Sequence, residues 1–536
     1  MRTKYIVILG SVMSGLGKGV VTSSILKLLD FYDYRALPIK FDGYLNYDCG
    51  TMNPYRHGEV FVLDDKGEVD MDFGLYERFL NRNMTSAQSI TGGKLFGSVI
   101  EKERQGGYLG VDVQIIPHLT GRAVEMIETV GKENKLDVVV VEVGGTVGDL
   151  ENSYFIEAVR QLALKEPTVF VNLTYTPTME VVGEQKTKPA QLGFKNLLQS
   201  GIMPNFVVCR SREHLLDKTR EKLALFANLT RDHVIDDSDQ ESTYMLPLHF
   251  MEQEFDKKLL EQLGLPGKRN REKLDSWKKR VHNILNPKYS VEIGILGKYT
   301  GLSDSYASIK EALVHAGAEL GAMAKMRWIE SESLEGENAD MSKLDGIDGL
   351  IVPGGFGKRG IEGMINGIRY ARETHMPYLG ICLGMQLMTV EYARNVCGLK
   401  DANSSEFNPL TEHKVISLME EQRGVRKKGG TMRLGLWECR LAKGTTAYSL
   451  YKKENIGERH RHRYEFNNRY RDLLQKNGLV ISGTTPDNKL VEFVEWKDSF
   501  GIATQSHPEL RSRLEAPAPL FVGLVRAALE RKSSGK

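Results

Sequence analysis

The sequence predicts an α/β protein with two domains, each a mostly parallel sheet covered by helices. At 536 residues the chain is long enough to bury two sizeable cores. Apolar runs of strand length alternate with helix-like stretches, the pattern of βα units. In both halves a strand-like run leads into a glycine-rich turn and then a helix-like segment, at residues 10–19 and 380–384. Such turns place functional groups at the carboxyl edge of a parallel sheet.

Composition excludes several classes of protein. Hydrophobic residues make up 41% and charged residues 26%, and the net charge is +2, which argues against disorder and against nucleic acid or a membrane as a partner. No apolar run has the length of a signal peptide or a membrane span. Because the number of cysteines is odd and CxxC spacing is absent, we expect neither a disulfide framework nor a cysteine zinc site. We therefore expect the protein to reside in a reducing cytoplasm. The cysteines are Cys49, Cys209, Cys382, Cys397 and Cys439.

The first strand-like run, residues 4–10, is followed by a glycine-rich loop and then by a helix-like stretch to about Phe31. Backbone N–H groups of such a loop cradle phosphate oxygens, and Lys18 adds a positive charge for them. The loop departs from the usual G-x-x-x-x-G-K-[ST] pattern, because Val12 replaces the first glycine and Gly19 the metal-binding hydroxyl. We therefore expect a nucleotide site whose metal ligands come from elsewhere.

Later strands of the first half supply those candidates. Lys40 ends a strand at 35–42, and a buried-type strand at 136–143 carries Glu142 near its end. Asp72 follows a turn-rich stretch. Asp72 and Glu142 could supply oxygen ligands for Mg²⁺, although an isolated carboxylate is by default a solvated surface group. Further strand-like runs at 168–175 and 202–209 complete the βα pattern.

A basic, polar stretch marks the domain boundary. Residues 265–288 are bounded by prolines, and Trp277, Val281, Ile284 and Leu285 recur at helical spacing. We therefore predict a first domain at 1–265, a linker helix within 266–289 and a second domain at 290–536.

The second domain begins with a strand at 290–297 and has a second glycine loop at 349–357. Its central feature is Cys382 in the turn GICLG, between a short apolar strand and a helix. Glycines flank the cysteine because so tight a turn leaves no room for Cβ atoms, and the helix N-terminus favours the thiolate. This is a nucleophile elbow.

A base for this cysteine lies far downstream. His507 is followed two residues later by Glu509, which can fix the imidazole tautomer, so Cys382, His507 and Glu509 form a candidate triad. These residues resemble the class I glutamine amidotransferases, whose cysteine attacks the glutamine amide and releases ammonia for a second site. Ser506 departs from the commonest form of that family.

Several motifs of the first half, taken with this second half, resemble the CTP synthase family almost end to end. They are residues 10–19, KFD at 40–42, GTM at 50–52, HGEV at 57–60, EVGGTVGDLE at 142–151 and KTKPAQ at 186–191. The resemblance implies an amidoligase that uses ATP to phosphorylate O4 of UTP, so that ammonia from glutamine displaces the phosphate and gives CTP.

The resemblance also implies ligands for individual residues. ATP would be held by Gly15, Leu16, Gly17, Lys18, Gly19, Lys40 and Asp72, with Mg²⁺ on Asp72 and Glu142. UTP, and CTP as a competing feedback inhibitor, would be held by Ser14, Asp149, Leu150, Glu151, Lys186, Thr187, Lys188, Pro189, Ala190, Gln191 and Lys222. Glutamine would be held by Gly355, Leu383, Gly384, Met385, Gln386, Glu406 and Arg463, with the N–H groups of Gly355 and Leu383 as an oxyanion hole.

Regulation and assembly are implied in the same way. Arg359 and residues 429–435 resemble elements linked to GTP, an activator, and the family implies a homotetramer. Two alternatives stay open: another ammonia-dependent ligase with the same modules, such as a cobyrinate amidating enzyme, and a nucleotide-switched scaffold such as a partitioning ATPase. KTKPAQ together with EVGGTVGDLE disfavours the first, and the triad has no purpose in the second.

Overall fold

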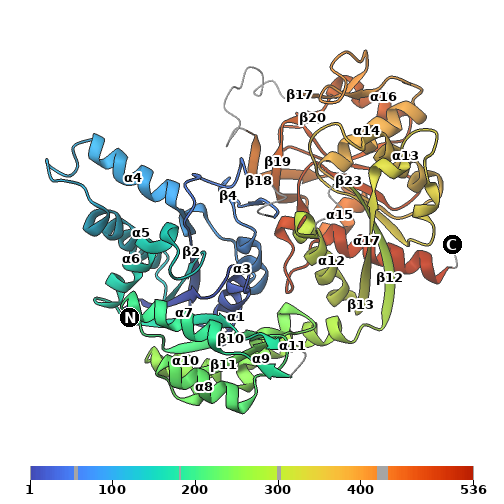
Figure 1. The fold of residues 1–536 in the computed structure, drawn as a ribbon. Coiled ribbons are helices and arrows are strands. Elements are labelled where there is room, and N and C mark those ends of the chain that lie inside the picture. Colours follow the sequence, from blue (N-terminus) through green and yellow to red (C-terminus); the bar gives the residue numbers. More distant parts are fainter. Residues whose placement is uncertain (1, 53–57, 180–182, 299–302, 419–431, 535–536) are drawn as a thin grey trace. The chain divides into compact units, whose positions relative to one another are not determined.

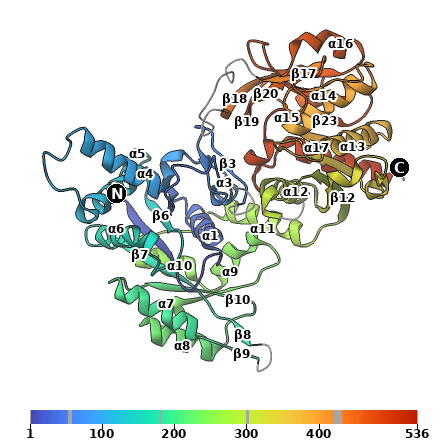
Figure 2. The ribbon, with the colours of Figure 1, turned by 45° about the horizontal axis from the view of Figure 1, so that its top comes forward.

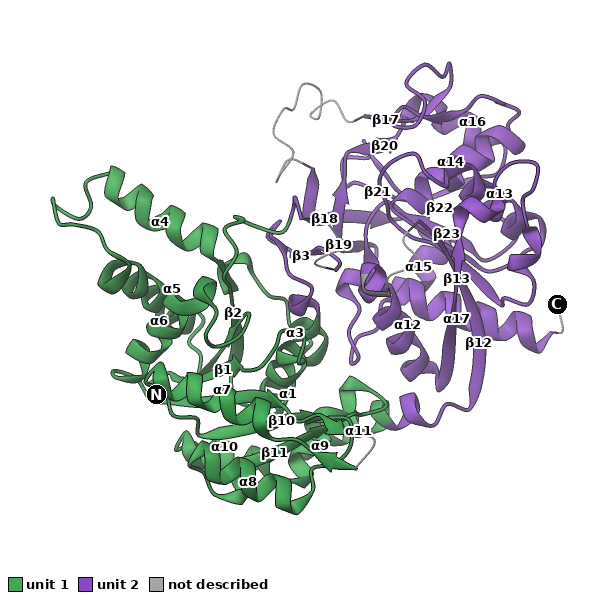
Figure 3. Cartoon of the chain, viewed as in Figure 1, with its two compact units in different colours: residues 1–49, 75–281 green, residues 50–74, 282–536 purple. Residues whose placement is uncertain are grey.

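The computed structural model describes residues 2–52, 58–179, 183–298, 303–418 and 432–534. Its contacts divide the chain into two compact units, shown in Figure 3: Met1–Cys49 with Leu75–Val281, and Gly50–Gly74 with His282–Lys536. Residues 50–74 thus group with the second unit, although the flanking sequence belongs to the first. Within the described ranges, no helix combines the length and apolarity needed to cross a bilayer.

Unit 1 is built on a seven-stranded sheet in the order β11-β10-β7-β1-β6-β2-β5, and every neighbouring pair in it is parallel. Its strands are β1 (Lys4–Gly10), β2 (Ala36–Asp42), β5 (Ser89–Thr91), β6 (Val138–Val143), β7 (Thr168–Tyr175), β10 (Phe206–Ser211) and β11 (Val234–Ser238), and a small hairpin adds β8 (Thr178–Met179) and β9 (Glu184–Gln185). The βα pattern predicted a mostly parallel sheet, and the observed sheet is parallel throughout, which brings the carboxyl ends of its strands to one edge.

Helices cover both faces of this sheet (Figures 1 and 2). Tyr5, Val7 and Leu9 alternate along β1 and share one buried cluster with α5 and α6, whereas α1 contacts β1, β2 and β6 outside that cluster. The helices are α1 (Lys18–Asp30), α4 (Gly92–Arg104), α5 (Thr120–Glu133), α6 (Ser153–Ala163), α7 (Lys188–Gln199), α8 (Asp217–Ala227), α9 (Leu246–Glu252) and α10 (Phe255–Gln262).

Two helices cross the division between the units. They are α3 (Asp72–Leu80) and α11 (Arg271–Leu285). The second lies where the sequence predicts a linker helix, and its buried residues Leu274, Trp277 and Val281 follow helical spacing.

Unit 2 contains a nine-stranded sheet in the order β13-β12-β14-β15-β23-β22-β21-β18-β19. It is parallel from β13 to β23 and antiparallel from β23 to β19, so the expected parallel arrangement covers one side of the sheet. The change follows from connection length: β21 and β22 are joined by a short turn containing Asp487 and Asn488, and such hairpins pair antiparallel.

Helices α13 and α14 pack on one face of this sheet, and α12 and α17 pack on the other. The strands are β3 (Phe61–Val62), β4 (Glu68–Val69), β12 (Tyr289–Gly297), β13 (Ala322–Glu330), β14 (Gly349–Val352), β15 (Tyr378–Ile381), β16 (Asn403–Ser404), β17 (Lys414–Leu418), β18 (Arg433–Leu441), β19 (Asn455–His462), β20 (Tyr464–Phe466), β21 (Val480–Thr484), β22 (Val491–Glu495) and β23 (Gly501–Thr504). The helices are α12 (Ala307–Leu320), α13 (Ile361–Glu373), α14 (Leu383–Asn395), α15 (Thr446–Tyr451), α16 (Arg471–Lys476) and α17 (Pro519–Ser533).

Candidate active sites

Cys382 stands between β15 and α14 in a strained turn. Its φ of 51° and ψ of −95° lie outside the regions that non-glycine residues favour. The flanking glycines are needed sterically: a Cβ at Gly384 would lie 2.2 Å from the Val352 carbonyl oxygen, and one at Gly380 would lie 2.7 Å from the Tyr378 hydroxyl. The turn therefore has the geometry of a nucleophile elbow.

His507 and Glu509 follow β23, the parallel neighbour of β15, so the sheet brings them next to the elbow. His507 Nδ1 and Glu509 Oε1 are 2.7 Å apart, and the Glu509 side chain is buried. Burial alone would lower the pKa of His507, but the Glu509 carboxylate and the Cys382 thiolate outweigh it and raise the pKa to about 10. The ring is thus held as an imidazolium, which stabilises a thiolate.

A glutamine beside the triad also contacts the nucleophile. The Gln505 side-chain amide donates to Cys382 Sγ at 3.5 Å, and its oxygen accepts from Gln386 Nε2 at 3.3 Å. Gln386 Nε2 also donates to the Tyr464 carbonyl at 3.1 Å. This chain of amides fixes the environment of the sulfur, and Gln386 acts in it as a hydrogen-bond donor to Gln505.

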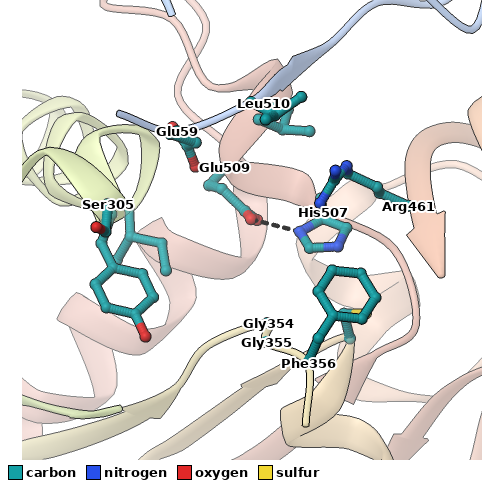
Figure 4. A pocket seen from close by; sticks show the side chains of 13 residues that line it. Glu59, Ser305, Gly354, Gly355, Phe356, Arg461, His507, Glu509 and Leu510 are labelled. Carbon is teal, nitrogen blue, oxygen red and sulfur yellow. Dashed lines mark hydrogen bonds and ion pairs between the residues drawn. The ribbon is translucent and has the colours of Figure 1, made fainter. Parts of the chain in front are cut away.

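The triad opens into a pocket of about 110 Å³, which Figure 4 shows with Glu509 pointing toward His507. Gly354 and Gly355 line it together with Cys382, and a Cβ at Gly354 would lie 2.7 Å from His507 Cε1. The absence of side chains here lets the backbone approach the reacting centre. Gly355 lines the pocket and Leu383 directly follows Cys382, so their N–H groups stay candidate oxyanion donors.

The other predicted glutamine ligands lie around this centre but do not line the pocket. Gly384 and Met385 are buried in the first turn of α14, directly after Leu383. Glu406 Oε1 accepts from the Gly357 N–H at 3.2 Å, and burial raises the pKa of Glu406. Arg463 is half-buried at the end of β19. Their contact with glutamine stays a prediction.

Two further charged residues line the pocket and were missed from the sequence. Arg461 lies on β19 two residues before Arg463, and its Nε donates to Glu68 Oε1 at 2.9 Å. Glu59 lies in the segment that groups with unit 2, and its Oε2 accepts from the Ser308 N–H at 2.9 Å. The alternation of side chains along β19 could have indicated Arg461. Arg459 and Arg461 lie on one face of the strand, and the buried His460 and His462 lie on the other.

In unit 1, the loop after β1 leads into α1 with positive φ at Gly15 and Gly17. Lys18 begins the helix, and its Nζ donates to the Gly145 carbonyl at 2.6 Å. A pocket of about 170 Å³ is lined by Gly15, Leu16 and Gly17 together with Arg210 and Asp237. Gly19 is in the first turn of α1. The geometry is that of a phosphate-binding loop beside a cavity.

Lys40 and Glu142 are register partners on β2 and β6, with Nζ and Oε1 3.6 Å apart. Tyr76 donates to the other Glu142 oxygen at 2.6 Å, and the Glu142 side chain is 1% exposed. Asp72 is the first residue of α3 and groups with unit 2, whereas Glu142 groups with unit 1. The pairing of these two carboxylates on one metal stays a prediction.

The predicted uridine-site residues lie in unit 1. Asp149 accepts from the Thr146 N–H and hydroxyl at 2.9 and 2.7 Å, and Leu150 and Glu151 follow it in a short helical turn. Lys188 begins α7 with Pro189, Ala190 and Gln191 in its first turn, and Gln191 Nε2 donates to Thr187 Oγ1 at 2.8 Å. Ser14 is exposed in the loop after β1.

Positive charges converge beside this motif. Lys186 Nζ is 2.6 Å from Glu184 Oε2, and Lys186, Lys218 and Lys222 together lower the pKa of Glu184. Lys188 and Gln191 line a groove between α7 and α8. Of the three lysines predicted to bind UTP, two, Lys186 and Lys222, thus lie within electrostatic reach of the Glu184 carboxylate.

The predicted GTP site comprises Arg359 and residues 429–435. Residues 429–431, and His57 of the HGEV motif, lie outside the described residues. The Arg433 side chain is 1% exposed and donates to Glu465 at 3.0 Å and Glu492 at 2.6 Å, so it ties β18 to β20 and β22. Arg359 lies 3.4 Å from Glu332 and donates to the Lys298 carbonyl, and burial lowers the pKa of Lys298 to about 8.

Comparisons with known proteins cover both units. Residues 4–265 match the family model "CTP synthase N-terminus", and residues 302–527 match "Glutamine amidotransferase class-I". A CTP synthase of Caldanaerobacter subterraneus subsp. tengcongensis is 48% identical over 533 residues, 99% of each chain, and one of Pyrococcus furiosus is 50% identical over 535 residues, 99% of this chain and 98% of that one. A solved Trypanosoma brucei CTPS glutaminase domain with bound acivicin is 39% identical, with a TM-score of 0.43, and covers 45% of this chain and 94% of its own.

Proposed function

Because the chain belongs to the CTP synthase family, we propose that its two candidate sites divide one reaction, the glutamine-dependent conversion of UTP to CTP at the expense of ATP. Unit 2 would release ammonia from glutamine, and unit 1 would activate UTP and accept the ammonia. The observation that carries the proposal is the strained Cys382 beside the His507–Glu509 pair, because a cysteine thiolate paired with an imidazolium is a nucleophile that can attack the glutamine amide.

In the glutaminase half, the Cys382 thiolate attacks the side-chain amide carbon of glutamine. The N–H groups of Gly355 and Leu383 would stabilise the tetrahedral oxyanion, and the His507 imidazolium would give its proton to the departing nitrogen. Ammonia leaves and a glutamyl thioester remains. Water, deprotonated by His507, then hydrolyses the thioester to glutamate and restores the thiol. Gly384, Met385, Gln386, Glu406 and Arg463 would hold the rest of the glutamine.

In the amidoligase half, the uracil O4 attacks the γ-phosphorus of ATP and ADP leaves. Ammonia then adds at C4, and inorganic phosphate departs with the former O4 oxygen. The loop 15–19 and Lys40 would hold the triphosphate of ATP. The cofactor we propose is Mg²⁺, which neutralises phosphate charge when bound, and the buried Glu142 carboxylate beside Lys40 offers the hard oxygen donor that it prefers. Asp72 would be the second ligand.

The uridine nucleotide would bind the lysines and loop residues gathered at Ser14, 149–151, 186–191 and Lys222. We also propose that CTP competes there with UTP, that GTP activates through the region of Arg359 and residues 429–435, and that the enzyme is a cytoplasmic homotetramer. Cys209, Cys382, Cys397 and Cys439 form no disulfide among the described residues, which supports a reducing compartment. The domain division that fits these roles is 1–265 and 290–536, joined by 266–289.

The decisive experiment compares nitrogen donors in Cys382→Ala. We expect glutamine-driven CTP formation to be lost and ammonia-driven formation to stay near the parental rate, since the variant lacks only the ammonia source. Cys397→Ala, a half-buried cysteine outside the site, is the matched control and should retain both activities. Equal loss with both donors in Cys382→Ala would contradict the two-site division.

A further inference from the structure

Three side chains in unit 1 converge outside every site described above. His214 lies in the loop between β10 and α8, Asp236 lies on β11 and His249 lies on α9. One ligand atom from each, two imidazole nitrogens and a carboxylate oxygen, lies within 4.8 Å of the others. His214 Nδ1 is 2.7 Å from Asp236 Oδ2, and His249 Nε2 is 3.6 Å from the same oxygen. Among the described residues, this is the one grouping of three such ligands with that spacing.

A second observation points to a missing partner. The Asp236 side chain is only 4% exposed, yet its other oxygen, Oδ1, is buried and makes no hydrogen bond. A buried carboxylate oxygen without a partner is costly, and native structures seldom leave one so. A cation that binds the carboxylate through both oxygens would give Oδ1 the partner that it lacks.

From this geometry we infer that His214, Asp236 and His249 form a binding site for a divalent transition-metal cation of the Zn²⁺ type. Zinc takes imidazole nitrogens and carboxylate oxygens at about 2.0–2.2 Å in tetrahedral sites, which places neighbouring ligand atoms about 3.4 Å apart. The observed separations of 2.7 and 3.6 Å bracket that value. Two nitrogen donors select against Mg²⁺ and Ca²⁺, so the site would take a different metal from the one proposed for ATP.

The surroundings supply what such a site needs. Ser238 Oγ lies 2.9 Å from His214 Nδ1 and 3.4 Å from Asp236 Oδ2, and it or water would complete the coordination. His249 Nδ1, the nitrogen that stays protonated, lies 3.7 Å from Glu252 Oε2. The His214 side chain is 76% exposed, which gives the cation a path from solvent.

The frame that carries the ligands is already fixed. The Gln253 side chain accepts from the Asp236 N–H at 2.8 Å and donates to its carbonyl at 2.9 Å, which ties β11 to α9. The same amide nitrogen lies 3.2 Å from His249 Nε2, a contact that a bound metal would replace. The bound cation would therefore need only small side-chain shifts.

The position of the cluster suggests what a bound metal would stabilise. Asp237, the next residue of β11, lines the pocket beside Gly15 and Gly17. On the other side, the His214 carbonyl accepts from Gln185 Nε2 at 2.9 Å, and Gln185 immediately precedes the motif at 186–191. A metal that joins the 212–216 loop to β11 and α9 would brace the protein between these two segments and raise its resistance to unfolding.

The test is titration of the full, untagged chain with Co²⁺ and with Zn²⁺, in excess Mg²⁺ and in the Cys382→Ala background, so that the catalytic thiol is not a ligand. We expect one equivalent of Co²⁺ to give visible d–d bands without a thiolate charge-transfer band, and Zn²⁺ to displace it. His214→Ala should weaken both ions at least about tenfold, since even outer-shell partners of a metal are worth that much. Zn²⁺ should raise the Tm of the parental chain and leave that of His214→Ala unchanged.

His282→Ala, another exposed histidine of the same chain, is the matched control and should bind as the parent does. Asp236→Asn keeps the shape of the buried ligand and should also abolish binding. If it fails to fold, His214→Ala still decides the question, because an exposed ring can be removed without loss of packing. No uptake, a thiolate band, or equal uptake by His214→Ala and His282→Ala would each overturn the site and leave the cluster as a hydrogen-bonded brace.

Discussion

Glu509→Gln tests how much of the glutaminase activity depends on the ion pair at His507. The substitution keeps the shape of the side chain and removes the charge that lies 2.7 Å from His507 Nδ1. A hydrogen bond between charged groups is worth about 1.5 to 3 kcal/mol, and about 1.36 kcal/mol corresponds to tenfold in rate. We therefore expect kcat/KM for glutamine to fall by about 10- to 150-fold.

The pH dependence gives a second, independent readout. In the parent, Glu509 and the Cys382 thiolate raise the pKa of His507 to about 10, so the imidazolium is lost only as the pH rises through that value. Without the carboxylate, burial pulls the pKa down, and the imidazolium deprotonates at lower pH. The alkaline limb of kcat/KM for glutamine should therefore move to lower pH, and the loss of activity should grow as the pH rises.

The assay is glutamate release from glutamine, followed from pH 6 to 10.5, alongside ammonia-driven CTP formation at one pH. Glu495→Gln is a matched control, because Glu495 is also a buried carboxylate of unit 2 but caps α15 by accepting from the Thr446 and Ala447 N–H groups at 2.9 and 2.7 Å. It should lower Tm, since a lost cap costs about 0.5 to 2 kcal/mol, and leave the pH profile in place. An unshifted alkaline limb in Glu509→Gln, or an equal fall in ammonia-driven synthesis, would refute the role given to this carboxylate.

Three further predictions concern the proposed nucleotide and metal sites. Lys18→Ala should remove CTP formation from glutamine and from ammonia alike, because the phosphate-binding charge is needed before nitrogen arrives; a near-parental rate with ammonia, ATP and UTP would move the ATP site elsewhere. Asp72→Asn and Glu142→Gln should each raise the Mg²⁺ concentration for half-maximal ammonia-driven synthesis, and unchanged Mg²⁺ titrations in both would exclude them as ligands. Lys186→Ala should weaken UTP and CTP by a similar factor of about ten or more, measured by UTP saturation at several CTP levels. Loss of UTP affinity with intact CTP inhibition would show that the two triphosphates bind separately.

The elements found from the sequence are those whose cause is local. The elbow is one, because its signal is the pair of glycines at 380 and 384 around Cys382, even though the groups that a Cβ would meet there include Val352 and Ala503 of neighbouring strands. The loop before α1 is another, since positive φ at Gly15 and Gly17 is a property of the glycines themselves. A sequence pattern of strand, glycine turn and helix is therefore enough to predict both of these turns.

Residues whose roles depend on distant partners were not found in this way. Gln505 contacts Cys382 only because β15 and β23 are parallel neighbours, and no spacing rule links the two positions. The antiparallel half of the second sheet was missed for a similar reason. Short apolar strands look alike in parallel and antiparallel sheets, and only the hairpin turn between β21 and β22 distinguishes them.

The grouping of residues 50–74 with unit 2 shows how side-chain pairing can override position in the chain. Arg459 Nε donates to Asp64 Oδ1 at 2.6 Å, with a guanidinium that is completely buried, and Arg461 pairs with Glu68. Removing one member of a buried pair leaves an uncompensated charge, so these contacts hold the segment against β19. Glu59 and Val60 of the same segment line the Cys382 pocket. The glutaminase pocket is therefore completed by residues that precede Leu75, in the part of the sequence that otherwise forms unit 1. Substitutions at Asp64 or Glu68 should accordingly affect glutamine hydrolysis.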